Sequence, residues 1–308
     1  MPWGADGPAS IAAPALCIVN PASGGGRSAR LWPDLLDRLT RGGLAVEHAV
    51  TRGPGHATAL AADAARAGVG LVVAVGGDGT LNEVVNGLVD EDGRARATVG
   101  ALFTGRGRDG ARTLGLPGDP ARGVARLLAG RPAARDLGLV RWRGGHRYFV
   151  TVAGAGFDAV VARRALGLAG PGTIPYLRAV GGSLRRYRPW PLRLSIDGAP
   201  SRTLQAAGVM FANGPCCGGG MRIAPGADPA DGALDLVVLG ALSRGALVRW
   251  LPTVYWGGHL RHPLITTERV ATAEVASDAP LPLQLDGEPW GEAPFDVSVA
   301  GGALRVLL

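Results

Sequence analysis

The chain has 308 residues, which is enough for two domains with a sizeable core, and 47% of them are hydrophobic. Its basic residues are all arginine, and the absence of lysine excludes a GxxxxGK P-loop, a protein-kinase strand lysine and a Schiff-base lysine. The net charge of +7 indicates attraction to anionic partners such as nucleotides or lipid headgroups. No apolar run reaches the roughly 20 residues of a membrane span. The three cysteines show neither a disulfide framework nor metal-ligand spacing, which favours a cytoplasmic protein.

The first part of the chain alternates between apolar strands and amphipathic helices. This alternation predicts an open parallel sheet with right-handed crossover connections. We expect a disordered N-terminus over residues 1–14 and an α/β domain over 15–137. Strands are predicted at 15–19, 44–50, 71–75 and 97–103, and helices at 29–39, 56–67, 81–89 and 119–129.

The most informative segment is the turn GGDGT, residues 76–80, between the third strand and the following helix. Its glycines allow a polyphosphate to approach the backbone amides at the start of the helix. Asp78 would repel phosphates unless a cation lay between them, so the turn is typical of a magnesium nucleotide site. Thr80 is predicted to be the N-cap, with Glu83 completing a capping box. An ordinary glycine-rich turn is the alternative.

Three further segments follow strands at the same edge of the predicted sheet, where open α/β sheets bind ligands. The loop NPASGGGR, residues 20–27, provides a second approach for phosphate. Thr51 could reach a base or ribose from the side, or could instead cap the next helix. The loop GRGRDG, residues 105–110, adds the carboxylate of Asp109.

From residue 138 onward, short strands alternate with Gly, Pro and Asp turns, which predicts a mainly β sandwich domain over 138–308. Asp197-Gly198 and Gly301-Gly302 are hairpin-type turns. No nucleic-acid-binding motif occurs, so nucleic acid is not an expected partner. Strands are predicted at 148–152, 192–196, 206–212, 234–239, 274–276 and 295–308.

Three motifs of this second part contain carboxylates. GAGFD, residues 154–158, follows a strand and ends in Asp158. DPADGA, residues 228–233, offers carboxylate and carbonyl oxygens that suit a hard cation, although such Asp-Gly turns are more often only turns. LDGE, residues 285–288, places two carboxylates close together, and they could act as a general base if the fold brings them to the nucleotide.

In their order and spacing, these motifs resemble the bacterial diacylglycerol and lipid kinases, which are related to the sphingosine kinases. The resemblance covers residues 20–288. It implies a nucleotide-binding α/β domain like that of NAD kinases, a β-sandwich domain after it, and an active site in the cleft between them. It also implies ATP and Mg²⁺ as cofactors. The residues implied for ATP binding are Asn20, Thr51, Gly76, Gly77, Asp78, Gly79, Thr80, Leu81, Asn82, Arg106, Asp109 and Asp158.

The resemblance assigns further roles. Asp78, Asp109 and Asp158 would order the magnesium nucleotide. The Asp228 and Ala233 carbonyls with the Asp231 carboxylate would hold a structural magnesium ion. Asp286, or Glu288 beside it, would take the proton from a lipid hydroxyl that attacks the γ-phosphate.

One loop departs from the family pattern. Where the family reads Gly-Thr-x-Asn-Asp, this chain has Gly-Arg-Gly-Arg-Asp at residues 105–109. Arg106 can replace the lost hydroxyl as a phosphate ligand, because guanidinium binds phosphate bidentately. No role follows for Arg108.

The implied acceptor is a membrane lipid of the diacylglycerol, sphingoid-base or phosphatidylglycerol type, so we expect a cytoplasmic protein at the inner face of the membrane. The basic and aromatic segments 184–190 and 250–262 are candidates for peripheral membrane contact. A homodimer remains open. Two alternatives also stay open: a soluble-substrate kinase of the NAD-kinase type, and a catalytically impaired relative that binds nucleotide or lipid.

Overall fold

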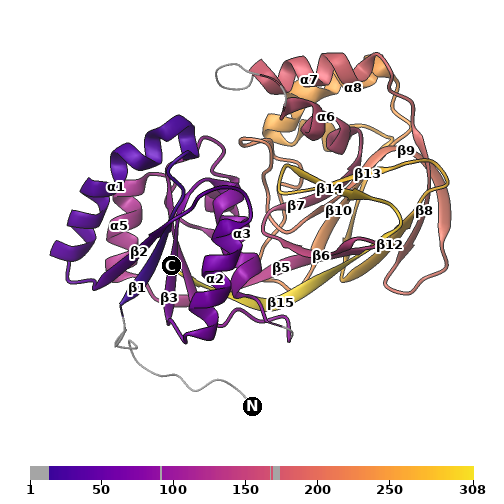
Figure 1. The fold of residues 1–308 in the computed structure, drawn as a ribbon. Helices are drawn as coiled ribbons and strands as arrows, with labels where there is room; N and C mark the ends of the chain where they lie inside the picture. The colour runs from indigo at the N-terminus through magenta and orange to yellow at the C-terminus, as the bar shows by residue number, and fades with distance from the viewer. Residues whose placement is uncertain (1–13, 91, 167, 169–173) are drawn as a thin grey trace. The chain divides into compact units, whose positions relative to one another are not determined.

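The computed structural model describes residues 14–90, 92–166, 168 and 174–308 (Figure 1). The segment predicted to be disordered, residues 1–14, lies outside the described residues except for Pro14. The chain divides into two compact units, which are described separately. The first comprises Met1–Gly105, Gly115–Ala134 and Ala303–Leu308, and the second comprises Arg106–Leu114 and Arg135–Gly302.

The first unit contains a parallel sheet with the strand order β2-β1-β3-β4, and this confirms the predicted open parallel sheet. Strands β3 and β4 are buried at every position, as expected for a parallel sheet covered on both faces. The end of β15 adds a further parallel strand beside β4, where Arg305 pairs with Thr98. The strands are β1 (Ala15–Val19), β2 (Val46–Val50), β3 (Leu71–Gly76), β4 (Thr98–Phe103) and the end of β15 (Phe295–Leu307), whose residues 295–302 belong to the second unit, where residues 295–298 pair with β12 (Thr272–Ala276).

Helices cover both faces of this sheet (Figure 1). Trp32, Leu35 and Leu39 of α1 pack with residues of α5 over one face, and α2 lies against α3 on the other. Asp119 caps α5 by accepting a hydrogen bond from the Arg122 backbone N–H at 3.0 Å. These helices are α1 (Ser23–Arg41), α2 (His56–Arg66), α3 (Asp78–Leu88) and α5 (Pro120–Ala129).

The second unit is mainly β, as predicted. Its strands pair antiparallel, and its core is built from large apolar side chains such as Phe149, Leu192 and Phe211. The strands are β5 (Pro132–Trp142), β6 (Gly145–Phe149), β7 (Val152–Gly156), β8 (Trp190–Ile196), β9 (Arg202–Ala212), β10 (Leu234–Gly240), β11 (Ile265–Val270), β12 (Thr272–Ala276), β13 (Pro282–Leu285) and β14 (Glu288–Glu292).

Helices of the second unit pack over a second apolar cluster, and α6, α7 and α8 lie together at one end of this unit (Figure 1). None of the described helices is both long enough and apolar enough to span a membrane. The helices are α4 (Asp109–Leu114), α6 (Phe157–Ala165), α7 (Ile174–Leu184), α8 (Arg244–Trp250), η1 (Leu251–Trp256) and η2 (Gly258–Arg261).

Two sequence predictions for the second part are wrong. The strand predicted at 148–152 is interrupted between β6 and β7, because the amides of Val150 and Thr151 donate to the Asp286 carboxylate instead of a strand partner. Gly301-Gly302 is not a hairpin turn, since β15 continues through it. Gly302 takes a φ of +61°, and its N–H donates to Asp136 Oδ1 at 2.6 Å, so the irregularity stays within the strand. The turn predicted at residues 197–198 is confirmed.

Candidate functional site

Three loops after strands of the first unit lie against one another at the carboxyl end of the sheet. A Cβ atom on Gly105 would lie 2.7 Å from the Gly77 Cα, and one on Gly24 would lie 2.5 Å from the Thr104 carbonyl oxygen. The Thr104 N–H and hydroxyl both reach the Gly76 carbonyl, at 2.8 and 3.3 Å. The loops therefore meet through bare backbone, which lets a phosphate approach their amides.

Helix α3 begins one turn earlier than its capping signature predicts. The N-cap is Gly77, and Asp78 is the first helical residue. The prediction that Thr80 is the N-cap is therefore wrong. Its hydroxyl instead accepts a hydrogen bond from Asn20 Nδ2 at 3.0 Å, which connects the loops after β1 and β3. A Cβ atom on Gly76 would lie 2.4 Å from the Thr80 hydroxyl, so this packing requires glycine there.

Glu83 does not complete a capping box with Thr80, so this prediction is also wrong. Its carboxylate accepts hydrogen bonds from the Gly55 and Ala57 amides, at 2.9 and 3.0 Å. Glu83 thus satisfies amides at the start of α2, and it ties α2 to α3. Because Gly55 is the N-cap of α2, the alternative in which Thr51 caps this helix is also excluded. Thr51 is buried at the end of β2.

In the second unit, Asp109 is buried on α4 and already has strong partners. Arg112 Nη1 lies 2.8 Å from Oδ1, and the Gly219 amide donates to Oδ2 at 2.6 Å. Burial raises the pKa of this carboxyl, and the Gly219 and Arg112 contacts oppose the shift. The role of Asp109 in ordering a magnesium nucleotide stays a prediction.

Asp158 lies in the first turn of α6 and has one oxygen with a partner and one without. Gln284 Nε2 donates to Oδ2 at 3.0 Å. Oδ1 is buried and has no hydrogen-bond partner among the described residues. Burial raises the pKa of this carboxyl to about 6. A Cβ atom on Gly154 would lie 1.8 Å from Oδ2, so the glycine of the GAGFD motif makes room for the carboxylate.

Asp286 and Glu288 lie in and after the turn of the β13–β14 hairpin. Asp286 has a φ of 49°, and its carboxylate accepts four hydrogen bonds, which engage both oxygens. The donors are the Val150, Thr151 and Val152 amides and the Thr151 hydroxyl, at 2.8, 2.8, 3.1 and 2.6 Å. Glu288 is exposed at the start of β14.

Three of the predicted carboxylates of the second unit are close enough to one thiol to affect its pKa. Cys217 is buried, and its pKa is raised well above the ordinary range, first by burial and then by the charges of Asp109, Asp158 and Asp286. Segments far apart in the sequence are thus brought together within the unit. The sequence offers no local signal for this gathering, because the thiol belongs to none of the motifs.

Sequence reasoning also missed Asp136, a buried carboxylate on β5. It accepts hydrogen bonds from the Gly232 amide at 2.8 Å and from the Gly302 amide at 2.6 Å. A carboxylate beside the apolar residues 137–140 is a signal that could have identified it, because buried carboxylates need partners.

The loop 228–233 is closed by its own contacts. Asp228 Oδ1 accepts from the Ala230 amide and Asp231 Oδ1 from the Ala233 amide, both at 3.1 Å. Asp231 Oδ2 pairs with the Arg269 guanidinium. Among the residues that the structure describes, no three His, Cys, Asp or Glu side chains are grouped so as to hold a metal ion.

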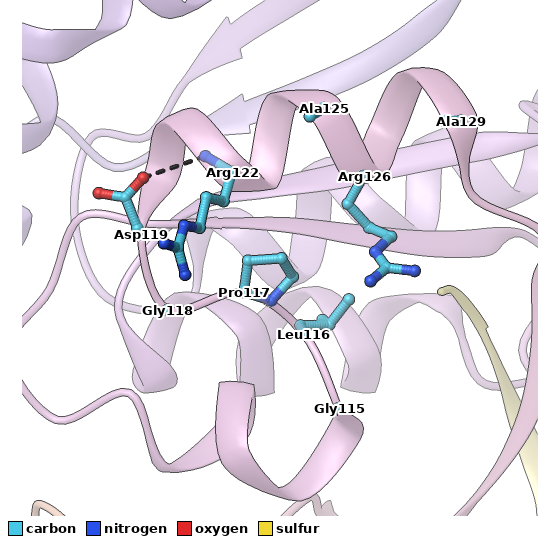
Figure 2. Close-up of a pocket in the computed structure, with 9 residues that line it drawn as sticks. All are labelled: Gly115, Leu116, Pro117, Gly118, Asp119, Arg122, Ala125, Arg126 and Ala129. Carbon is cyan, nitrogen blue, oxygen red and sulfur yellow. Dashed lines mark hydrogen bonds between the residues drawn. The ribbon is translucent and has the colours of Figure 1, made fainter.

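A pocket of about 560 Å³ lies beside α5 in the first unit (Figure 2). Arg122 and Arg126 line it together with apolar residues of the preceding loop such as Leu116 and Pro117. Its only carboxylate, that of Asp119, is the helix cap drawn in Figure 2. None of the residues predicted to bind nucleotide lines this pocket.

Models of two protein families match the chain. The diacylglycerol kinase catalytic domain matches residues 14–140, and the YegS C-terminal NAD kinase beta sandwich-like domain matches residues 151–308. The chain therefore belongs to the family of diacylglycerol kinases and YegS-like lipid kinases.

Individual relatives agree with this assignment over nearly the full length. A diacylglycerol kinase of Mycobacterium tuberculosis is 32% identical to this chain, and the match covers 94% of this chain and 93% of the relative's length. A Chromohalobacter salexigens protein named "Probable lipid kinase YegS-like" is 31% identical, over 91% and 89%. The crystal structure of a diacylglycerol kinase from Bacillus anthracis shares the fold, with a TM-score of 0.76, 24% identity and 96% coverage of each chain.

Proposed function

We propose that this lipid kinase transfers the γ-phosphate of Mg-ATP to a lipid hydroxyl of the diacylglycerol, sphingoid-base or phosphatidylglycerol type. The observation that carries this proposal is the backbone contact between Gly77 and Gly105 at the start of α3. The first amides of a helix have no partner within the helix, and they carry partial positive charge. Side-chain-free loops around such amides suit a polyphosphate.

The first unit would bind the nucleotide. Asp78 in the first turn of α3 would meet the phosphates through Mg²⁺, because its own charge would otherwise repel them. Asn20 and Thr80 would face the phosphates from two neighbouring loops that they already join. Leu81 and Asn82 are buried, so they would contribute through the backbone of α3.

The second unit would supply the proton acceptor, and its geometry favours Glu288 over Asp286 for this role. The hydrogen bonds from the Val150, Thr151 and Val152 amides and the Thr151 hydroxyl engage both Asp286 oxygens in holding the hairpin turn. Glu288 is exposed two residues later, where it can accept a proton from a substrate hydroxyl. Asp286 would then act as a positioning residue.

The second unit would also meet the membrane, through a surface formed by α6, α7 and the α8–η1 segment. Between residues 159 and 196 the sequence has seven arginines and no acidic residue. Tyr187 is buried, and its hydroxyl donates to the Leu242 carbonyl, so it joins α7 to the start of α8 instead of facing lipid. The exposed apolar side chains of this surface are Leu166, Val248, Tyr255 and Trp256. Six of the arginines are exposed on it: Arg163, Arg164, Arg178, Arg185, Arg186 and Arg188.

Such a surface suits an anionic bilayer, because its cations meet the headgroups and its rings occupy the interface. Its contribution would be measured by co-sedimentation with vesicles. Vesicle binding that changes with neither the salt concentration nor the content of anionic lipid would argue against this membrane-binding surface.

The test of the function is transfer of label from radiolabelled ATP to diacylglycerol, sphingosine, phosphatidylglycerol or NAD. Glu288→Gln should lower kcat by a factor on the order of 10²–10⁴, the usual contribution of a general base, and should leave nucleotide affinity and Tm unchanged. Asp286→Asn should lower both kcat and Tm, because it removes charge-assisted hydrogen bonds from the turn. The control is Glu292→Gln, an exposed carboxylate at the end of the same strand.

If Glu288→Gln keeps the full turnover rate, Glu288 is not the general base of the reaction. Phosphorylation of NAD alone would support the alternative of a soluble-substrate kinase. If the unaltered protein phosphorylates none of the four acceptors, the alternative of a catalytically impaired relative would be supported.

A further inference from the structure

The structural magnesium site implied by the family resemblance does not fit the contacts of this chain. A cation there would need the Asp231 carboxylate. One oxygen of that carboxylate accepts the Ala233 amide, and the other faces the Arg269 guanidinium. A divalent ion would have to displace the arginine or lie directly beside its positive charge, which is unfavourable.

We propose that the Arg269 guanidinium takes the place of a divalent cation and fixes the loop 228–233 without metal. Arg269 lies on β11 directly opposite Asp235 of β10. Its backbone is therefore beside Asp235, while its guanidinium pairs with the Asp231 carboxylate, so one cation is near two carboxylates whose charges would repel. Unlike a metal ion, this cation is covalently part of the chain and is always charged.

The other side of the loop is also held without an ion. The Asp136 carboxylate accepts the Gly232 amide at 2.8 Å, and the Asp136 N–H donates to the Pro229 carbonyl at 2.6 Å. Asp136 thus holds the backbone of the loop from β5 while Arg269 holds it from β11. Together they supply both the anchoring and the charge neutralisation that a bound ion would provide.

Nearby charges agree with this arrangement. Asp235 lies opposite Arg269 on the neighbouring strand, and the Asp231 carboxylate pairs with the Arg269 guanidinium. Removing its charge should leave two carboxylates facing each other, an arrangement that attracts Mg²⁺ or Ca²⁺.

The test measures Tm of the nucleotide-free protein with excess EDTA, with millimolar Mg²⁺ and with millimolar Ca²⁺. The unaltered protein should show the same Tm in all three. Arg269→Gln should lower Tm in EDTA by about 2–4 °C, the shift expected when a domain of this size loses one anchoring contact. Mg²⁺ or Ca²⁺ should restore most of this loss. Activity is not the readout, so the result does not depend on the proposed kinase reaction.

Arg202→Gln is the matched control. Arg202 pairs with Glu268, the residue next to Arg269, in an exposed pair at 3.1 Å. Both arginines are exposed, but the Glu268 side chain is 49% exposed whereas that of Asp231 is 28% exposed, so Arg202→Gln should change Tm by no more than about 1 °C and should not respond to divalent ions.

Three outcomes of the Tm measurements would overturn the proposal. In the first, the Tm of the unaltered protein falls in EDTA and returns with Mg²⁺. In the second, the Tm of Arg269→Gln changes no more than that of the Arg202→Gln control. In the third, the Tm of Arg269→Gln falls but divalent ions do not restore it. EPR of added Mn²⁺ provides a second readout. It should detect one more ion bound to Arg269→Gln than to the unaltered protein, and equal binding would contradict the replacement.

Discussion

Replacing Asp158 with Asn should stabilise the protein, and the gain should grow with pH. Burial raises the pKa of this carboxyl from 3.8 to about 6. The folded protein therefore holds the proton more tightly than the unfolded chain does. Below about pH 4 both states are protonated, and Asp158 has no effect on the pH dependence of stability. Between about pH 4 and pH 6 the unfolded chain loses this proton while the folded protein keeps it, so the free energy of unfolding falls as the pH rises; above about pH 6 the folded state holds a buried charge and the loss levels off.

The size of the effect follows from the shift. A difference of about two pKa units at about 1.4 kcal/mol each gives an upper value of about 3 kcal/mol above pH 7. Asparagine is nearly isosteric and keeps an oxygen that can accept from Gln284 Nε2, so the existing hydrogen bond should survive. We therefore expect Asp158→Asn to raise the free energy of unfolding by about 1–3 kcal/mol at pH 7.5, with a smaller gain near pH 5.

Urea unfolding followed by tryptophan fluorescence between about pH 5 and pH 8 measures this difference. Asp278→Asn is the control with the opposite sign, because the Arg193 hydrogen bond lowers the pKa of this exposed carboxyl. A difference between Asp158→Asn and the unaltered protein that is flat across this range, or that shrinks as pH rises, would refute the reasoning. If Asp158 also orders the nucleotide, Asp158→Asn should be more stable but less active than the unaltered protein, because carboxylates kept for function often lower stability.

Two further substitutions test the first unit. Gly105→Ala should weaken binding of an ATP analogue at least about tenfold, as measured by calorimetry, because its Cβ would lie 2.7 Å from the Gly77 Cα. The control is Gly53→Ala, whose Cβ would have no atom within 4 Å and which should not weaken binding. Equal affinities of Gly105→Ala and the unaltered protein would show that nucleotide binding does not need the close contact between Gly77 and Gly105. Glu83→Ala should lower the free energy of unfolding by about 1–2 kcal/mol, since it removes both acceptors for the first amides of α2. An unchanged urea midpoint would reject this capping role.

The first unit is predictable from sequence because its signals are local. The apolar run 71–75 marks a strand buried on both faces, and the helices after it carry one apolar stripe each. The failure at Thr80 and Glu83 has a specific cause. Both residues match a local capping signature, yet both are used by partners far along the chain, Asn20 and the start of α2. A capping motif cannot reveal that a tertiary contact competes for the same side chains.

The second unit is less predictable because its irregularities are set by distant carboxylates. Asp286 interrupts the strand at residues 150–151 from 135 residues away, and Asp136 holds Gly302 from 166 residues away. The motifs predicted which carboxylates would be important, but not their partners. The charge of Asp231, for example, suggested a metal ion, whereas its contact is an arginine 38 residues later.

Strand β15 has a consequence for the order in which this protein can be completed during synthesis. Its final residues, 303–307, belong to the first unit, where Arg305 and Val306 pair with β4. Translation proceeds from the N-terminus, so the first unit lacks this strand until residues 303–307 have left the ribosome. A deletion of only these residues would therefore damage the half of the protein encoded first, and an N-terminal fragment would expose the β4 edge to unwanted pairing.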